Sequence, residues 1–334
     1  MSNLDARYTK LKSQIFAIDS AAAFESTALE VFYFQYEQTP LYRQWVDSLG
    51  IDAKTVRELH EIPFLPIRFF KEHQILRKGT EAEIVFSSSG TTGMQRSRHF
   101  VADLDLYRTS FRAGFRHFYG PVEDYVVLAL LPSYLEREGS SLIFMAEDLI
   151  QYSGQKESGF YLNEHKELHR MLSKLKAEGR KTLLLGVSFG LLDFAEQYHI
   201  DFPDLIVMET GGMKGRRKEM VREELHRIYC DAFGVSQIHS EYGMTELLSQ
   251  AYSRGEGVFK TPPWMQVLIR DTNDPLSLVK GNRSGGVNII DLANLNSCAF
   301  IATQDVGKLL PGSSFEILGR FDHSDVRGCN LLVL

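Results

Sequence analysis

Apolar side chains recur at helical spacing in the first part of this chain, residues 1 to about 60. One such stripe consists of Leu29, Phe32, Tyr33 and Tyr36. This part is therefore predicted to be helical, and Pro40 is expected to end the run. The segment 62–67 contains two prolines. It is predicted to be an extended connector, because each proline moves the preceding residue out of the α region.

Between residues 83 and 238, short apolar runs alternate with amphipathic stretches. The predicted strands are 83–86, 125–131, 182–187, 205–208 and 235–238. The predicted helices are 104–118, capped by Asp103, then 164–176, 191–198 and 215–233, with Gly234 as the final stop. Strands that alternate with helices favour an α/β domain built on a largely parallel sheet.

From about residue 257 the pattern changes to short strands separated by turns. The predicted strands are 265–269, 287–290, 300–303 and 315–318, with glycines between them. A smaller β subdomain is therefore predicted to complete the chain.

The composition is that of a soluble globular protein with one large domain or two fused ones. The chain has 334 residues, of which 44% are apolar and 24% charged, and its formal net charge is −6. It contains no basic block and no apolar run of about eighteen residues, so we expect neither nucleic-acid binding nor membrane insertion. Its polar N-terminus does not predict a signal peptide, and three widely spaced cysteines favour a reducing, cytoplasmic location.

A loop rich in hydroxyl groups and glycine follows the first predicted strand. It consists of Ser87, Ser88, Ser89, Gly90, Thr91, Thr92 and Gly93, with Arg96 and Arg98 close behind. Glycine lets backbone N–H groups form a concave nest, the hydroxyls add donors, and the arginines add positive charge, which together suit a polyphosphate. The loop lacks the Gly-Lys-Ser/Thr ending of the nucleotide hydrolases. A flexible linker is the alternative interpretation.

Two further motifs follow predicted strands. At Gly211 and Gly212 the backbone can approach a flat ligand closely, although a plain turn is equally consistent. The segment 241–246 combines a tyrosine ring, a hydroxyl and two carboxylates. In it Glu246 could hold Mg²⁺ beside a nucleoside triphosphate, and Thr245 could donate to a phosphate or acyl oxygen. The alternative is a solvated helix start in which the glutamate accepts from N-terminal amides.

Three candidates lie in the C-terminal part. Asp305 could accept hydrogen bonds from ribose hydroxyls, although turn-forming aspartates are equally common. Arg320 could reach ribose or phosphate. Cys329, which follows a glycine, could accept an acyl group because a thiolate suits thioester formation, although a lone cysteine is usually structural.

In this order and spacing, the motifs resemble those of the adenylate-forming superfamily, which includes acyl-CoA synthetases, peptide-synthetase adenylation domains and luciferases. Segment 87–93 is similar to its phosphate loop, 242–246 to its Tyr-Gly-x-Thr-Glu motif, 303–307 to its Thr-Gly-Asp element and 319–322 to its hinge. The segments 63–71 and 319–332 most resemble the acyl-protein synthetase of the bacterial bioluminescence fatty-acid reductase.

The resemblance implies an adenylate-forming core with mostly parallel sheets flanked by helices. Its parts would be a helical N-terminal region at 1–80, an α/β nucleotide-binding core at 81–256 and a β subdomain at 257–334 that ends at the hinge. It implies ATP and Mg²⁺ as cofactors and a carboxylic acid, by this likeness a fatty acid, as substrate. The acyl-adenylate would then give its acyl group to a thiol, which could belong to Cys329, to an acyl-accepting protein or to CoA.

Roles for individual residues follow from the same resemblance. The nucleotide would be bound by Ser88, Ser89, Gly90, Thr91, Thr92, Gly93, Gly211, Gly212, Tyr242, Gly243 and Asp305. Glu246 would hold the metal, while Thr245 would contact the α-phosphate and Arg320 the ribose or the hinge.

The chain departs from the family in three respects. Arg96 and Arg98 stand in the region where the phosphate loop usually ends in lysine, and Gln304 replaces the glycine of Thr-Gly-Asp. Only 12 residues follow Asp322. We therefore expect the chain to lack the C-terminal domain, normally of roughly a hundred residues, that supplies a catalytic lysine in acyl-CoA synthetases. This favours the acyl-protein synthetase type.

Other functions stay open. The segment 186–190 matches the Gly-x-Ser-x-Gly nucleophile elbow of α/β-hydrolases, with Ser188 as nucleophile and Asp305 and His323 as its partners. The same motifs would also fit an acyl-CoA ligase-like protein that needs a partner, or a non-catalytic protein that binds nucleotide or acyl-adenylate.

Overall fold

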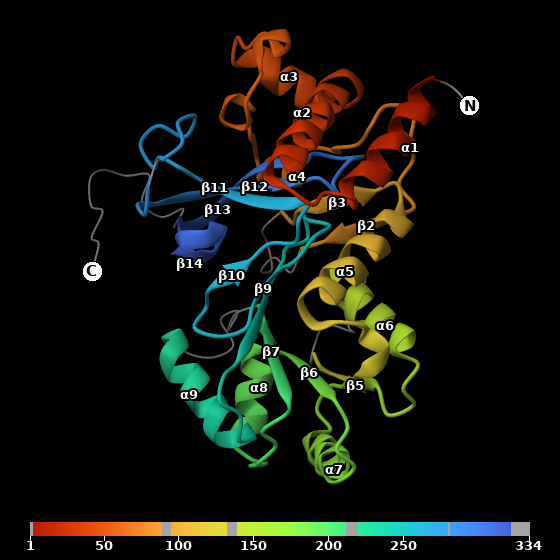
Figure 1. Cartoon of the computed structure of the whole chain (residues 1–334), viewed down its shortest axis with the longest axis vertical. Helices are drawn as coiled ribbons and strands as arrows, with labels where there is room; N and C mark the ends of the chain where they lie inside the picture. The colour runs from red at the N-terminus through yellow and green to blue at the C-terminus, as the bar shows by residue number, and fades with distance from the viewer. Residues whose placement is uncertain (1–2, 89–94, 132–138, 212–219, 280, 322–334) are drawn as a thin grey trace.

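A mixed β-sheet runs through the molecule (Figure 1). The computed structural model describes residues 3–88, 95–131, 139–211, 220–279 and 281–321. Within them the sheet has 12 strands. These are β1 (Leu65–Pro66), β4 (Val126–Leu130), β5 (Gly159–Tyr161), β6 (Thr182–Val187), β7 (Ile206–Thr210), β8 (His239–Tyr242), β9 (Ala251–Ser253), β10 (Phe259–Lys260), β11 (Met265–Arg270), β12 (Ser284–Asp291), β13 (Phe300–Leu309) and β14 (Phe315–Arg320). A separate hairpin consists of β2 (Ile84–Ser87) and β3 (Arg98–Val101).

The sheet order is β11-β12-β13-β14-β10-β9-β8-β7-β6-β4-β5, with β1 beside β13. In this spatial order, the neighbouring pairs among β5, β4, β6, β7 and β8 are parallel. The pairs from β8 through β9, β10, β14, β13 and β12 to β11 are antiparallel. The predicted α/β class is thus confirmed, and the change in strand direction makes the sheet mixed. Because parallel strands end at the same edge, the residues after β6, β7 and β8 come together there.

Helices pack around this sheet. They are α1 (Asn3–Ile15), α2 (Ala21–Gln38), α3 (Pro40–Ser48), α4 (Phe69–Glu72), α5 (Leu104–Tyr119), α6 (Ser141–Ser153), α7 (His165–Ala177), α8 (Ser188–Ala195) and α9 (Arg222–Phe233). In Figure 1, α1 to α4 lie at one end of the molecule near β11 to β13, and α7 to α9 lie at the other end around β6 and β7. The helices α6 to α9 are the crossovers between the parallel strands.

Several bounds differ from the predicted ones. The predicted strand 235–238 is wrong, because Val235 and Ile238 are buried in a loop and β8 begins only at His239. Pro40 does not end the helical region but is the first residue of α3. An N–H at this position would have no partner within the helix, so proline removes no helical hydrogen bond. The helix predicted at 191–198 begins earlier, at Ser188. Of the predicted helix 215–233, residues 215–219 lie outside the described part.

The sequence did not predict α6. Its N-terminus is capped by Ser140, whose hydroxyl accepts a hydrogen bond from the N–H of Ile143 at 3.3 Å. Apolar and polar residues are mixed along α6, so its buried stripe is difficult to recognise in the sequence. This stripe includes Met145, Ala146 and Leu149. The prediction failed because this stripe is narrow and its other positions are only partly covered.

The chain between β12 and β13, residues 292–299, is a buried loop in which every residue is less than 9% exposed. A buried loop must pair its backbone groups within the protein. Much of this pairing comes from Gln35 of α2. Its side-chain amide donates to the carbonyls of Asn294 at 2.8 Å and Leu295 at 3.1 Å, and its Oε1 accepts from the N–H of Ala299 at 2.9 Å.

We predict that Gln35→Ala destabilises the fold, because it removes one side chain that satisfies three buried backbone groups. The expected loss is about 2–4 kcal/mol in the free energy of unfolding, measured by urea titration. The matched control is Gln151→Ala, which removes an exposed helix-surface bond to Glu147 and should change this free energy by less than about 0.5 kcal/mol. Equal, small losses in the two variants would contradict the assigned role.

Candidate functional site

The β2–β3 hairpin holds the two ends of the predicted phosphate loop together. Ser87 faces Arg98 across the hairpin, and beyond this pair the N–H of Ser88 donates to the carbonyl of Ser97 at 3.0 Å. In return, the N–H of Ser97 donates to the hydroxyl of Ser88 at 3.0 Å. The predicted residues Ser89, Gly90, Thr91, Thr92 and Gly93 lie outside the described part of the chain. Ser88, the remaining residue of this set, is therefore at the base of the loop.

Three of the predicted site residues form one hydrogen-bonded group. The hydroxyl of Tyr242 donates to Asp305 Oδ2 at 2.6 Å, and Arg320 Nε donates to Asp305 Oδ1 at 2.8 Å. Asp305 and Arg320 face each other on β13 and β14, and Tyr242 is the last residue of β8. The Asp305 side chain is only 6% exposed and that of Arg320 is 72% exposed. The carboxylate is thus fixed from inside, and the arginine extends toward solvent.

The environment of Tyr242 keeps its hydroxyl protonated. Its ring lies 5.8 Å from the rings of both Phe259 and Phe315, between centroids. Burial, together with the negative charge of Asp305 and the hydrogen bond to it, raises the pKa of Tyr242 well above 10. The phenol is therefore a permanent donor at neutral pH and holds the carboxylate in one orientation.

Glu246, the predicted metal ligand, is buried at 6% exposure. Burial raises the pKa of its carboxyl above 4.5, while a hydrogen bond to the Ser97 side chain and the charges of Arg320 and Lys71 oppose the shift. The described residues contain no cluster of three or more His, Cys, Asp or Glu side chains that could hold a metal. Glu246 fits Mg²⁺ as a single protein ligand, since this ion is usually completed by phosphate and water oxygens.

The segment that carries Thr245 is held by its backbone. The carbonyl of Thr245 lies 2.9 Å from Nδ1 of His99 in β3, and the side chain of Asn294 donates to the carbonyl of Glu246 at 2.8 Å. A Cβ at Gly243 would lie 2.4 Å from Oε1 of Glu241, so any other residue here would require this glutamate side chain to move. The predicted site residues of this segment are therefore positioned by close packing and by side chains from distant parts of the chain.

The end of β7 carries another predicted residue, Gly211, which has a φ of 71° that favours glycine. Its carbonyl accepts from the Ser188 hydroxyl at 3.0 Å, and the same hydroxyl lies 2.5 Å from Glu209 Oε1. Glu209 Oε2 lies 2.9 Å from Nε2 of His226. Gly212, which was predicted to bind the nucleotide together with Gly211, is outside the described residues.

These contacts do not form a hydrolase triad. Ser188 is 2% exposed, and its hydroxyl contacts a glutamate directly, whereas a nucleophilic serine needs histidine as its immediate neighbour. Asp305 contacts Tyr242 and Arg320 instead of a histidine. The other expected partner, His323, lies outside the described part. The arrangement around Ser188 supports the end of β7 structurally.

Two residues that sequence reasoning missed hold this region. His99 is 1% exposed, and burial lowers the pKa of its imidazole from 6.5 to about 4. Asp291 is fully buried, and burial raises the pKa of its carboxyl from 3.8 to about 6, although four hydrogen bonds oppose the shift. Those bonds come from Ala293, from the Leu248 N–H, and from both the N–H and the hydroxyl of Ser249. The available sequence signal was only a polar residue beside apolar ones, at the second position of β3 for His99 and at the end of β12 for Asp291.

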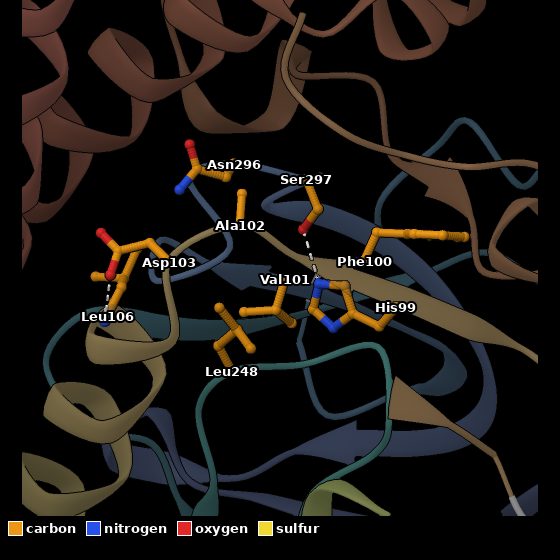
Figure 2. A pocket seen from close by; sticks show the side chains of 9 residues that line it. All are labelled: His99, Phe100, Val101, Ala102, Asp103, Leu106, Leu248, Asn296 and Ser297. Carbon is orange, nitrogen blue, oxygen red and sulfur yellow. Dashed lines mark hydrogen bonds between the residues drawn. The ribbon is translucent and has the colours of Figure 1, made fainter. Parts of the chain in front are cut away.

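A small pocket lies behind β3 (Figure 2). Its lining residues are His99, Phe100, Val101, Ala102, Asp103, Leu106, Leu248, Asn296 and Ser297. Its cavity volume is about 10 Å³, room for about one water molecule and far below the roughly 300–1,000 Å³ of ligand pockets. It includes none of the predicted nucleotide-binding residues, so it does not represent the nucleotide site. It marks where β3, α5 and the buried loop meet.

We predict that Tyr242→Phe destabilises the protein by about 1.5–3 kcal/mol, because it removes a buried hydrogen bond to a charged group. The free energy of unfolding at pH 7 measures this loss. Tyr36→Phe is the matched control: it breaks a bond of 2.7 Å to Asp47 that is exposed, and should cost under about 0.5 kcal/mol. A wild-type value for the Tyr242 variant would mean that the phenol does not hold Asp305.

No protein-family model matches this chain, and no curated protein matches it. Solved structures do. An open conformation of 2-hydroxyisobutyryl-CoA ligase (HCL) in complex with 2-HIB-AMP and CoA is similar over 92% of this chain and 72% of that chain, with a TM-score of 0.62 and 12% identity. ATP-bound MatB from Rhodopseudomonas palustris is similar over 71% of this chain, with a TM-score of 0.55 and 15% identity.

A luciferase-like enzyme from the mealworm Zophobas morio is also similar, with a TM-score of 0.50 and 16% identity over 82% of this chain and 62% of that chain. The present chain spans about half of the MatB chain, 47% of its length. No helix in the described ranges is both long and apolar enough to cross a membrane. At these identities the likeness establishes the fold alone: the chain has an α/β fold similar to those of 2-hydroxyisobutyryl-CoA ligase and MatB.

Proposed function

We propose that this protein activates a carboxylic acid with ATP and transfers the resulting acyl group to a thiol. The acid carboxylate attacks the α-phosphorus of ATP, the bond to the β-phosphate oxygen breaks, and pyrophosphate leaves. The acyl-adenylate then reacts with the thiol, which forms a thioester and releases AMP. The observation that carries the proposal is the group of Tyr242, Asp305 and Arg320.

This group suits a ribose. Each oxygen of Asp305 accepts one hydrogen bond from the protein, from Tyr242 or from Arg320, and keeps a further lone pair for a ligand hydroxyl. The guanidinium of Arg320 uses Nε for Asp305, so its remaining N–H groups can meet a phosphate or ribose oxygen. The ligand names of similar structures, ATP, 2-HIB-AMP and CoA, support the same chemistry for this chain.

The triphosphate would lie between the base of the phosphate loop and the segment 242–246. Ser97 connects the two, because it pairs with Ser88 and hydrogen-bonds to Glu246. Thr245 would donate to the α-phosphate. A bound Mg²⁺ would neutralise charge on the departing pyrophosphate, and Glu246 would be its protein ligand.

The acyl acceptor that we propose is Cys329, on the basis of the acyl-protein synthetase resemblance. The other two cysteines are poor candidates. Cys298 is fully buried, and burial raises the pKa of its thiol to about 12. Burial also raises the pKa of the Cys230 thiol above 9. Since the thiolate is the nucleophile, both are less reactive near neutral pH than an ordinary cysteine. CoA or a partner protein is the alternative acceptor, and the acid would be a fatty acid.

We predict that Glu246→Gln lowers the rate of acid-dependent ATP–pyrophosphate exchange by at least about 100-fold, because it removes the carboxylate that would hold the metal. Glu178→Gln, at an exposed position on the surface, is the control and should keep wild-type exchange. Unfolding midpoints of both variants show whether they are folded. A wild-type rate of pyrophosphate exchange in the Glu246 variant would contradict the assignment of Glu246 as the metal ligand.

Acyl transfer is tested by the intact mass of the protein after incubation with ATP, Mg²⁺ and a mixture of fatty acids. We expect an ATP-dependent gain of one acyl group that hydroxylamine removes. In Cys329→Ala this gain should disappear while pyrophosphate release continues, and Cys230→Ala should behave as wild type. Pyrophosphate release without a mass gain in the wild type would assign the acceptor to CoA or a partner. ATP binding without release would indicate a non-catalytic binder.

A further inference from the structure

We propose that His99 is the positioning residue for Thr245, and that it couples the phosphate-loop hairpin to the Tyr-Gly-x-Thr-Glu segment. The rate effects expected from this proposal rest on the function proposed above, whereas its structural part depends on the contacts alone. His99 Nδ1 lies 2.9 Å from the carbonyl oxygen of Thr245. Its Nε2 lies 2.9 Å from the hydroxyl of Ser297, as Figure 2 shows.

These two partners determine which nitrogen carries the proton. A carbonyl oxygen can only accept, so Nδ1 must be the N–H that donates to Thr245. The other nitrogen of a neutral imidazole then has a lone pair, and the Ser297 hydroxyl can donate to it. Burial of His99 favours this neutral form near pH 7. His99 is therefore a fixed donor to the carbonyl of Thr245.

The position of His99 on β3 explains the coupling. Ser97 is the residue immediately before β3, two positions from His99. Ser97 hydrogen-bonds to the Glu246 side chain, and His99 binds the peptide group that joins Thr245 to Glu246. The strand that leaves the phosphate loop thus contacts both of these residues. A shift of the hairpin would move them together.

The ring itself cannot turn freely. Phe70 of α4 packs against it edge-on, with 5.4 Å between ring centroids and an angle of 89°. On the other side Ser297 belongs to the buried loop, whose Asn294 holds the carbonyl of Glu246. His99 is therefore held by two partners that are fixed elsewhere, and it transmits their position to Thr245.

The test compares two substitutions of similar size. Asparagine places its amide nitrogen at the distance of Nδ1 from the backbone, so His99→Asn can still donate to Thr245. Glutamine reaches the position of Nε2, so His99→Gln keeps the contact with Ser297 and loses that with Thr245. We expect H99Q to lower kcat of pyrophosphate exchange by about 10- to 100-fold with KM for ATP changed less than about threefold. H99N should restore most of kcat.

A structural readout accompanies the kinetics. In ¹⁵N-labelled wild-type protein, the His99 ring should show the Nδ1–H tautomer at pH 7. Amide hydrogen exchange of residues 245–248 should be faster in H99Q than in H99N. Ser297→Ala, which removes only the second bond, should lower kcat less than H99Q does, even if its unfolding midpoint falls further.

Several results would overturn the proposal: an Nε2–H tautomer, equal kcat in H99Q and H99N, or a loss that follows the unfolding midpoints across all three variants. If the wild-type protein shows no pyrophosphate exchange, the proposed function fails. The tautomer and the exchange of 245–248 then decide the role of His99 by themselves.

Discussion

The structure depends on one constraint: the polar groups of a buried loop must find partners inside the protein. Residues 292–299 are such a loop, and their partners come from distant segments. Gln35 binds it from α2, and the N–H of Arg77 donates to the carbonyl of Asn296 at 2.8 Å. The loop in turn binds His99 and the backbone of Glu246. The N-terminal helices, the β2–β3 hairpin and the segment 242–246 are thereby joined through one piece of chain.

A buried carboxylate reinforces this junction. Asp291, at the end of β12, accepts hydrogen bonds from the backbone of Leu248 and from both the backbone and the hydroxyl of Ser249. The indole of Trp264 and the hydroxyl of Ser110 share the Ser249 oxygen at 3.0 Å and 2.9 Å. The turn that follows Glu246 is thus fixed by a network whose members depend on one another. The buried loop binds the backbone of Glu246, and this network binds the backbone of Leu248 and Ser249, so both hold the same short segment.

The sequence predicted those parts of the fold that are set locally. The bounds of β6, 182–187, were correct because a buried parallel strand is a continuous apolar run. Asp103 capped α5 as predicted, since its carboxylate accepts from the N–H of Leu106 at 2.8 Å. The contact of His99 with Thr245 joins residues 146 positions apart. No local pattern encodes it, because it depends on how the hairpin packs against the sheet.

In the candidate site, too, the sequence predicted the local motifs but not the long-range contacts. Tyr242, Asp305 and Arg320 were named from their motifs, but their contact depends on strand register. Arg320 faces Asp305 only because β13 and β14 pair with an irregularity at Val306 and Gly307. Period and composition do not predict such a shift.

The carboxylates of Asp305 and Glu246 lie in opposite electrostatic environments, and this difference fits their proposed roles. Asp305 is stabilised by a phenol and a guanidinium before any ligand binds, so it needs little reorganisation to accept a ribose. Glu246 is buried, and burial raises its pKa. A buried carboxylate of this kind is an unfavourable charge by itself. A cation held between it and a phosphate would remove that cost, so metal and nucleotide would favour each other's binding.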